Sequence, residues 1–276
     1  MPGRLLLVGG GKMGGALLAG WLARGVAPRD VVVIEPAAAA AAALRDRHGV
    51  VVHTAPDAID PAFRPATMVV AIKPQMMDAV IPGYRRFAGP DTAILSIAAG
   101  TPIAYYHRVL GPEAVVVRAM PNTPAAVGHG ISVLCADDKA SAAQRDACQA
   151  LLDAVGRTVW VADEEMLHAV TAVSGGGPAY VCLLVECLAH AGVAAGLPED
   201  LAMTISRATV AGSGALLDGS EEPANQLRAN VTSPKGTTER ALAVLMAEDA
   251  MQPLFDRAIA AATARSRELA GDESSR

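Results

Sequence analysis

The chain has 276 residues, of which 52% are hydrophobic and only 3% aromatic, so its core must be built from aliphatic side chains. The formal net charge of −5 argues against a nucleic-acid partner on electrostatic grounds. The four cysteines contain no C-x-x-C pair, which favours buried thiols in a reducing cytoplasm and predicts no metal site.

Up to about residue 161 the pattern alternates between short β-branched runs and helix-forming segments. The expected strands cover residues 4–9, 31–35, 49–53, 67–72, 92–97, 114–119, 130–136 and 157–162, with helices at 13–25, 37–48 and 139–155. Continuous apolar runs without polar alternation predict strands that are buried on both faces, as in a parallel sheet. This pattern predicts a Rossmann-type, doubly wound α/β domain over residues 1–162.

After residue 162 the strand signals stop, and the remaining segments are typical of helices. These segments cover residues 163–173, 178–195, 198–217, 235–248 and about 250–270. We therefore predict an all-α domain over residues 163–276. The apolar stretch at 178–197 contains Glu186 and His190, which favours a buried core helix of a cytoplasmic protein over a membrane span.

The first chemical motif is Gly9-x-Gly11-x-x-Gly14, placed directly after a strand and at the start of a helix. Glu35 follows at the end of the second strand, where an acidic side chain accepts hydrogen bonds from ribose hydroxyls. The motif predicts a dinucleotide site, with the pyrophosphate at the helix N-terminus. Because Glu35 would repel a 2′-phosphate, we expect NADH to be preferred over NADPH.

Three further loops follow expected strands, at residues 72–75, 96–100 and 118–125. In a doubly wound sheet the carboxyl ends of strands carry the ligand-binding loops. Lys73, in the first of these loops, is expected to project toward the cofactor. Taken alone, each loop could equally be a proline-bearing turn.

A second motif, VTSPKGTTERAL at residues 231–242, places a proline, a glycine and several hydroxyls at one bend. We expect Ser233 to cap a helix whose first turn is Pro234, Lys235 and Gly236, with the N–H groups of residues 235–237 left free. Such a helix start binds a carboxylate through its N–H donors and the helix dipole. Thr238 would lie at the edge of this pocket.

These segments together closely resemble the pyrroline-5-carboxylate reductases along nearly the whole chain. The most specific matches are AVSGGGPAY at residues 172–180 and NVTSPKGTTERAL at 230–242. The resemblance implies reduction of L-1-pyrroline-5-carboxylate to L-proline with NAD(P)H, the final step of proline biosynthesis. It also implies a helical domain that forms a homodimer, with dimers typically assembling to a decamer.

The resemblance assigns the substrate carboxylate to the loop at 233–238 and the ring nitrogen to the hydroxyl of Thr238, the expected catalytic residue. The expected substrate-binding residues are Glu221, Ser233, Gly236, Thr237 and Thr238. The expected cofactor-binding residues are Val8, Gly9, Gly10, Gly11, Lys12, Met13, Glu35, Ala71, Lys73, Pro74, Asn122 and Asn230. Glu221 could instead be a solvated charge at a helix end.

Two positions depart from the family pattern. Lys235 replaces the first glycine of the usual SPGG, and as the second residue of the helix it is expected to need no positive φ. Gly176 replaces a serine in the usual SGSGPAY. Both departures bear on substrate affinity.

Rival functions remain at this stage. A β-hydroxyacid dehydrogenase would place a lysine on the long helix of the second domain, and residues 175–197 contain none. A reductase of other imines and a catalytically silent pyridine-nucleotide sensor stay open. Of the six histidines, only His129 lies near an expected site loop.

Overall fold

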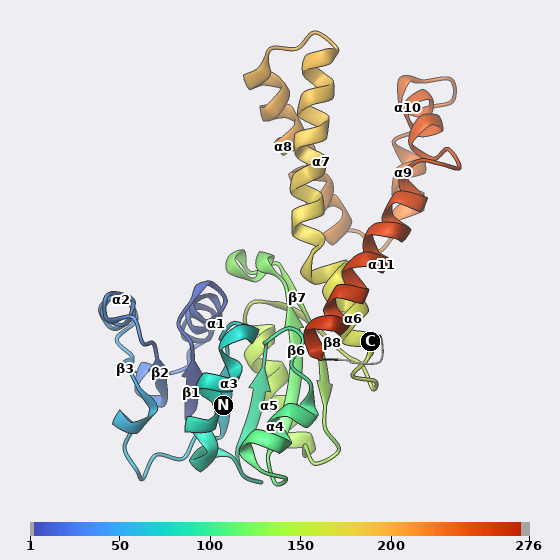
Figure 1. Ribbon diagram of the computed structural model, residues 1–276. Coiled ribbons are helices and arrows are strands. Elements are labelled where there is room, and N and C mark those ends of the chain that lie inside the picture. Colours follow the sequence, from blue (N-terminus) through green and yellow to red (C-terminus); the bar gives the residue numbers. More distant parts are fainter. Residues whose placement is uncertain (1–2, 272–276) are drawn as a thin grey trace. The chain divides into compact units, whose positions relative to one another are not determined.

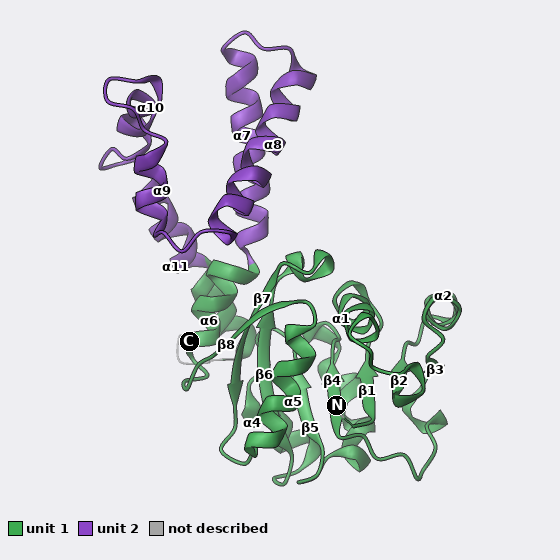
Figure 2. Ribbon diagram, turned by 180° about the vertical axis from the view of Figure 1, so that it is seen from behind, with its two compact units in different colours: residues 1–175, 262–276 green, residues 176–261 purple. Residues whose placement is uncertain are grey.

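The computed structural model describes residues 3–271 and divides the chain into two compact units (Figure 2). Unit 1 comprises Met1–Gly175 and Ala262–Arg276, and unit 2 comprises Gly176–Ala261. The boundary predicted at residue 162 therefore differs from the division between the units. The reason is that α6 (Met166–Val170) packs through Leu167 on the sheet of unit 1, and the C-terminal part of the last helix returns to the same unit.

Unit 1 is built on one eight-stranded sheet with the order β3-β2-β1-β4-β5-β6-β7-β8 (Figure 1). The strands are β1 (Leu5–Val8), β2 (Val31–Ile34), β3 (Val51–His53), β4 (Thr67–Val70), β5 (Ala93–Ser96), β6 (Val115–Pro121), β7 (Gly130–Ala136) and β8 (Gly156–Trp160). All neighbouring pairs are parallel except β6 and β7, which are antiparallel. This order confirms the predicted doubly wound α/β architecture.

The sheet is buried on both faces, as its continuous apolar strands predict. On β1, Leu5 and Leu7 join one core with Trp21 of α1 (Lys12–Ala23) and residues of α2 (Ala38–His48) and α5 (Ala142–Asp153). Leu6 and Val8 face the other way, into a second core with α3 (Met77–Val80), the 3-10 segment η4 (Ile81–Phe87) and α4 (Ile103–Leu110). Successive side chains of a strand point to opposite faces, so one strand serves both cores.

Unit 2 contains only helices among its residues, all of which the structure describes. They are α7 (Gly177–Ala194), α8 (Glu199–Asp218), α9 (Ala224–Asn230), α10 (Thr237–Leu245) and the first part of α11 (Met251–Ala270). The all-α character was predicted, but α9 was missed and α10 is shorter than the predicted helix at 235–248. The short α9 lies between two prolines, and it is too short to show a clear helical pattern of apolar residues.

Helix α7 is a clear correction. It was expected to be a buried core helix, yet within the single chain it packs mainly against α8, where Ala189 and Ala202 are buried. The continuous helical stretch Met166–Ala194 is long and apolar enough to cross a membrane by length and composition, and only 11% of its most apolar window is buried. Cys182 and Cys187 are exposed on it, so the prediction of buried thiols holds only for Cys135 and Cys148.

Candidate functional site

The glycine-rich turn between β1 and α1 brings the backbone against the neighbouring strand. Gly9 has a φ of +100°, and a Cβ atom there would lie 2.6 Å from the carbonyl oxygen of Ala71. A Cβ on Gly14 would overlap the carbonyl oxygen of Gly9. The turn thus requires glycine at both positions, because the missing side chains let its backbone pack closely against the end of β4 and against itself. At Gly11 a Cβ atom would meet no atom within 4 Å, so the backbone is open to a ligand there.

Helix α1 begins at Lys12 with Gly11 as its N-cap, and no side chain caps it. The first N–H groups of this 12-residue helix therefore have no side-chain acceptor at the turn. The helix dipole adds a partial positive charge at the same end. This helix start is suited to a phosphate group.

Glu35 follows β2 and points back to the glycine turn. Its carboxylate accepts one hydrogen bond from the N–H of Gly10 at 3.1 Å and another from the N–H of Ala37 at 3.0 Å. The two bonds hold both carboxylate oxygens beside the turn. A ribose lying across the turn would meet an anionic acceptor here.

Two hollows flank Glu35 and the turn. One is a cavity of about 250 Å³ at the carboxyl ends of β1, β2 and β4, with mostly apolar walls that include Val8, Ile34, Ile72 and Tyr84. Apolar walls of this kind are suited to a flat heteroaromatic ring.

The other hollow is an open groove of about 550 Å³ between α1 and α2, lined by the turn together with Lys12, Arg47 and His48. Burial, and then the charge of Arg47, lower the pKa of His48 below its ordinary value.

The expected cofactor residues after β4 lie next to the turn. The N–H of Ala71 donates to the carbonyl of Val8 at 2.8 Å, which ties the ends of β4 and β1 together. Lys73 is exposed and Pro74 begins a 3-10 turn, η3 (Pro74–Met76). The structure therefore brings together residues 8–13, Glu35 and the segment at 71–74 at one edge of the sheet.

Asn122 follows β6 at the same edge of the parallel strands. Its Oδ1 accepts a hydrogen bond from the N–H of Ile131 at 2.9 Å, and its Nδ2 lies 3.3 Å from Oγ of Ser174. Ser174 was not among the expected site residues. The sequence could have indicated Ser174, because this residue belongs to the AVSGGGPAY segment at 172–180.

The remaining expected residues belong to unit 2 and are exposed or half-buried in the single chain. Asn230, the last residue of α9, donates through Nδ2 to Glu222 at 3.0 Å and accepts from Gln226 at 2.8 Å. Glu221 is exposed next to this small network. These bonds fix the end of α9 immediately before the second motif.

The loop at 233–236 differs from the prediction. Helix α10 begins at Thr237 with Gly236 as its N-cap, so Ser233 does not cap it. The N–H of Gly236 donates to the carbonyl of Ser233 at 3.0 Å, and Lys235 has a φ of +61°. Proline at the second position and a positive φ at the third are typical of a type II turn. The expectation that Lys235 needs no positive φ is therefore wrong.

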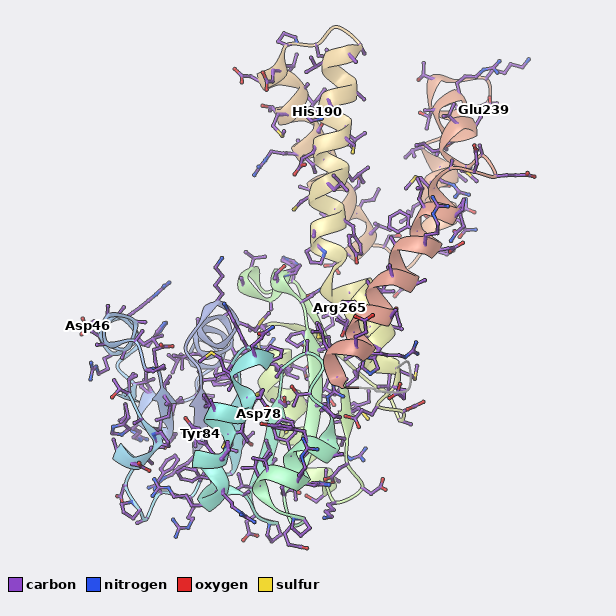
Figure 3. The ribbon with its side chains drawn as sticks, viewed as in Figure 1. Asp46, Asp78, Tyr84, His190, Glu239 and Arg265 are labelled. Carbon is purple, nitrogen blue, oxygen red and sulfur yellow. The ribbon has the colours of Figure 1, made fainter. Side chains whose placement is uncertain are left out.

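The loop also has fewer free N–H donors than expected. The N–H of Lys235 is bonded to Oε2 of Glu239 at 2.6 Å, and that of Gly236 belongs to the turn. Figure 3 labels Glu239 on α10. The helix start offers the N–H groups of Thr237 and Thr238, its first two residues, together with their hydroxyls.

Comparisons with known proteins cover nearly the whole chain. Residues 164–269 match the family model for pyrroline-5-carboxylate reductase dimerisation, and residues 4–100 match that for NADP oxidoreductase, coenzyme F420-dependent. The pyrroline-5-carboxylate reductase of Pseudomonas aeruginosa is 38% identical over 268 residues, which cover 97% of both chains.

Two solved structures have folds similar to that of this chain. A pyrroline-5-carboxylate reductase from Coxiella burnetii has a TM-score of 0.90 and 30% identity, covering 98% of this chain and 99% of its own. The Plasmodium falciparum pyrroline carboxylate reductase with NADP bound has a TM-score of 0.80 and 25% identity, covering 97% and 98%.

Proposed function

This chain belongs to the pyrroline-5-carboxylate reductase family, and from that premise we propose which of its residues perform the reaction. The protein is an NAD(P)H-dependent oxidoreductase that reduces the C=N bond of L-1-pyrroline-5-carboxylate to give L-proline. When bound, the reduced nicotinamide supplies the hydride. The protein's own work is to hold the two reactants in register, to exclude water and to steady the nitrogen of the ring.

The dinucleotide is held by unit 1. The turn at residues 9–13 and the N-terminus of α1 receive the pyrophosphate, and Glu35 receives the hydroxyls of the adenosine ribose. The uncapped helix start, and the open space at Gly11, where a Cβ atom would meet no atom within 4 Å, support this assignment. Ala71, Lys73, Pro74 and Asn122 would then line the nicotinamide half, because they follow β4 and β6 on the other side of β1.

The preferred cofactor is NADH. Glu35 is held beside the glycine turn by two backbone N–H groups, so its negative charge stays where a 2′-phosphate would have to sit. Placing two anions together costs free energy unless a cation intervenes.

The substrate is held by the second motif. Its carboxylate binds at the start of α10 through the N–H groups of Thr237 and Thr238, with Ser233 and Gly236 shaping the loop. The hydroxyl of Thr238 donates to the ring nitrogen and steadies the protonated imine. We also assign Glu221 to the substrate and Asn230 to the cofactor, as the resemblance to the family implies. The observation that carries this assignment is the position of Thr238 in the first turn of a helix that no side chain caps.

Unit 2 is also the proposed homodimer interface, because it matches the dimerisation domain and exposes large apolar side chains. They include Val181, Leu183, Leu184, Leu188, Val193, Leu201, Ile205, Leu216 and Leu217. We propose that dimers assemble further to a decamer in the cytoplasm. Analytical ultracentrifugation would measure the assembly, and a monomer at micromolar concentration would contradict the dimer.

The test of the reaction is to mix the protein with L-1-pyrroline-5-carboxylate and follow the oxidation of NADH and NADPH. Thr238→Ala should lower kcat/KM by roughly 10²-fold, the scale of a lost proton donor, and leave NADH affinity unchanged. Thr238→Ser keeps the hydroxyl and should retain most of the activity. A wild-type rate in Thr238→Ala removes the residue from the mechanism. Cofactor binding without turnover would point to another imine substrate or to a sensor.

A further inference from the structure

The side-chain amide of Asn122 is held in one orientation. Its oxygen accepts the N–H of Ile131 at the start of β7, at 2.9 Å. A backbone N–H requires an acceptor, so this bond identifies which end of the amide is the oxygen. The NH₂ group must then point the other way, toward Ser174.

Ser174 lies on a turn of unusual geometry. Residues Thr171–Gly175 form a π-helix, η6, between α6 and α7. The hydroxyl of Thr171 donates to the carbonyl of Leu167 at 2.7 Å, and such a bond to the fourth preceding residue bends a helix. Single π-turns inside helices occur frequently at functional sites, because they aim a side chain that an α-helix would direct elsewhere.

The π-turn lies close to the end of β6. A Cβ atom on Gly175 would lie 2.5 Å from Cε of Met120, so glycine leaves room for the end of this flexible side chain. In this position Oγ of Ser174 lies 3.3 Å from Nδ2 of Asn122. Both side chains are half-buried, so a ligand can still reach them.

Asn122 and Ser174 together keep two hydrogen-bond donors that are not used in the bond between them. Asn122 uses one hydrogen of its NH₂ group on Ser174 and keeps the second. Ser174 accepts that bond through an oxygen lone pair and keeps its own hydroxyl hydrogen. Two neutral donors next to each other are suited to an uncharged carbonyl oxygen rather than to a phosphate, which calls for cations or a helix start.

Topology identifies which part of a dinucleotide would reach them. The strand order reverses at β1, with β2 on one side and β4, β5 and β6 on the other. Glu35 follows β2, so the adenosine half lies on that side, and the nicotinamide half extends over β4 to β6. The carbonyl oxygen of the nicotinamide carboxamide is an uncharged acceptor on that half.

We propose that Ser174, together with Asn122, binds the carboxamide of the nicotinamide and so fixes which face of the ring is presented for hydride transfer. Ser174 acts partly through Asn122, whose amide it orients, and partly through its own hydroxyl. The proposal rests on the proposed function for the identity of the cofactor, but not for the identity of the substrate.

The test compares Ser174→Ala with Ser174→Thr, which keeps a hydroxyl, and with Val173→Ala as a matched control. Val173 is on the same π-turn and 60% exposed. The affinities of NADH and of ADP-ribose, which lacks the nicotinamide, are measured without substrate. Ser174→Ala should weaken NADH about five- to tenfold, as expected for one lost hydrogen bond, and leave ADP-ribose unchanged. Ser174→Thr should recover most of the NADH affinity, and Val173→Ala should match the wild type.

A second readout follows the hydride step with NADH deuterated at C4. If the ring is held less well in Ser174→Ala, hydride transfer becomes more rate-limiting and the isotope effect on kcat/KM increases. Unchanged NADH affinity in Ser174→Ala, or an equal loss for ADP-ribose, would overturn the proposal. Since binding is measured without the imine, failure of the wild type to reduce L-1-pyrroline-5-carboxylate would count against the proposed reaction and not against this site.

Discussion

Oε2 of Glu35 lies 3.1 Å from the backbone nitrogen of Gly10, so the acidic residue at the end of β2 is bonded directly to the glycine turn at the end of β1. The two ends of the predicted cofactor motif, 25 residues apart in sequence, therefore form one structural unit. Because the bond fixes the position of the charge, the charge of Glu35 and its geometry can be separated by mutation.

Glu35→Gln should shift cofactor preference toward NADPH. The amide keeps an oxygen that can accept the Gly10 N–H but removes the negative charge. We expect the ratio of kcat/KM for NADH over NADPH to fall roughly tenfold, which corresponds to about 1.4 kcal/mol of relieved repulsion. Asp46→Asn is the control, because Asp46 is an exposed acid on α2 (Figure 3). An unchanged ratio in Glu35→Gln, or a wild type that prefers NADPH, would contradict the role given to Glu35.

Gly14→Ala should damage the site through the backbone. A Cβ at this position overlaps the carbonyl oxygen of Gly9, and a backbone atom cannot move without displacing the turn. We expect the free energy of unfolding to fall by about 1–3 kcal/mol, which is typical when an extra group is forced into a packed region. NADH binding should weaken at least tenfold. Urea denaturation and cofactor titration would measure the two effects.

Gly15→Ala provides the comparison for that experiment. The nearest atom to a Cβ at Gly15 is the carbonyl oxygen of Gly10 at 3.6 Å, which is an ordinary contact. Replacing a glycine inside α1 by alanine should stabilise the helix by up to about 1 kcal/mol. Equal destabilisation by the two alanines would mean that the overlap at Gly14 is not the cause.

The sheet and the turn could be predicted because local sequence determines them. Apolar runs such as Leu5–Val8 and Val31–Ile34 indicate strands buried on both faces, and the structure confirms it. Gly9, Gly14 and Glu35 have the spacing of a dinucleotide-binding motif and stand where an expected strand is followed by an expected helix, so their proximity was also predictable.

What the sequence did not reveal depends on long-range packing or on a choice between two local conformations. Ser174 reaches Asn122 across 52 residues, through a π-turn that no periodicity indicates. At Pro234-Lys235, a helix start and a type II turn are both compatible with the proline. Lysine disfavours the turn, and the hydrogen bond from Gly236 to Ser233 forms nevertheless.

Lys235→Gly should stabilise the loop. Lys235 has a φ of +61°, and among the described residues it is the one non-glycine with positive φ. A side chain in the left-handed region costs roughly 1–2 kcal/mol, part of which glycine offsets through its greater freedom in the unfolded chain. We therefore expect a net gain of about 0.5–1 kcal/mol in unfolding free energy.

Lys235→Ala separates backbone conformation from charge. Alanine removes the ammonium group but keeps the Cβ, so it should not stabilise the protein. If alanine stabilised the protein as much as glycine, the effect would come from the charge and not from the positive φ. KM for L-1-pyrroline-5-carboxylate in both variants would show whether the ammonium group assists carboxylate binding.

The fold should lose stability at alkaline pH because of its buried tyrosines. Tyr106 is fully buried on α4 with its hydroxyl 2.5 Å from that of Ser96. Burial raises the pKa of Tyr106 and of Tyr84 above the ordinary value of 10.0, and burial together with the nearby carboxylate of Asp78 raises the pKa of Tyr105 to about 12. Above pH 10 the unfolded chain releases these protons while the folded chain keeps them. The contribution of these tyrosines to stability is therefore fully present below about pH 10 and falls as the pH rises toward 12, by up to about 1.4 kcal/mol per pH unit for each group.

Two variants on this pair test the cause. Tyr106→Phe removes the ionisable group, so the decline above pH 10 should become shallower, at a cost of about 1 kcal/mol at neutral pH from the lost hydrogen bond. Ser96→Ala loses the same bond but keeps the phenol. Since the bond to Ser96 lowers the pKa of Tyr106, its removal should leave the alkaline decline at least as steep as in the wild type. Urea titrations at pH 7, 9, 10 and 11, followed by the fluorescence of buried Trp21, would measure these slopes. Identical slopes in Tyr106→Phe and the wild type would mean that this tyrosine does not ionise on unfolding in that range.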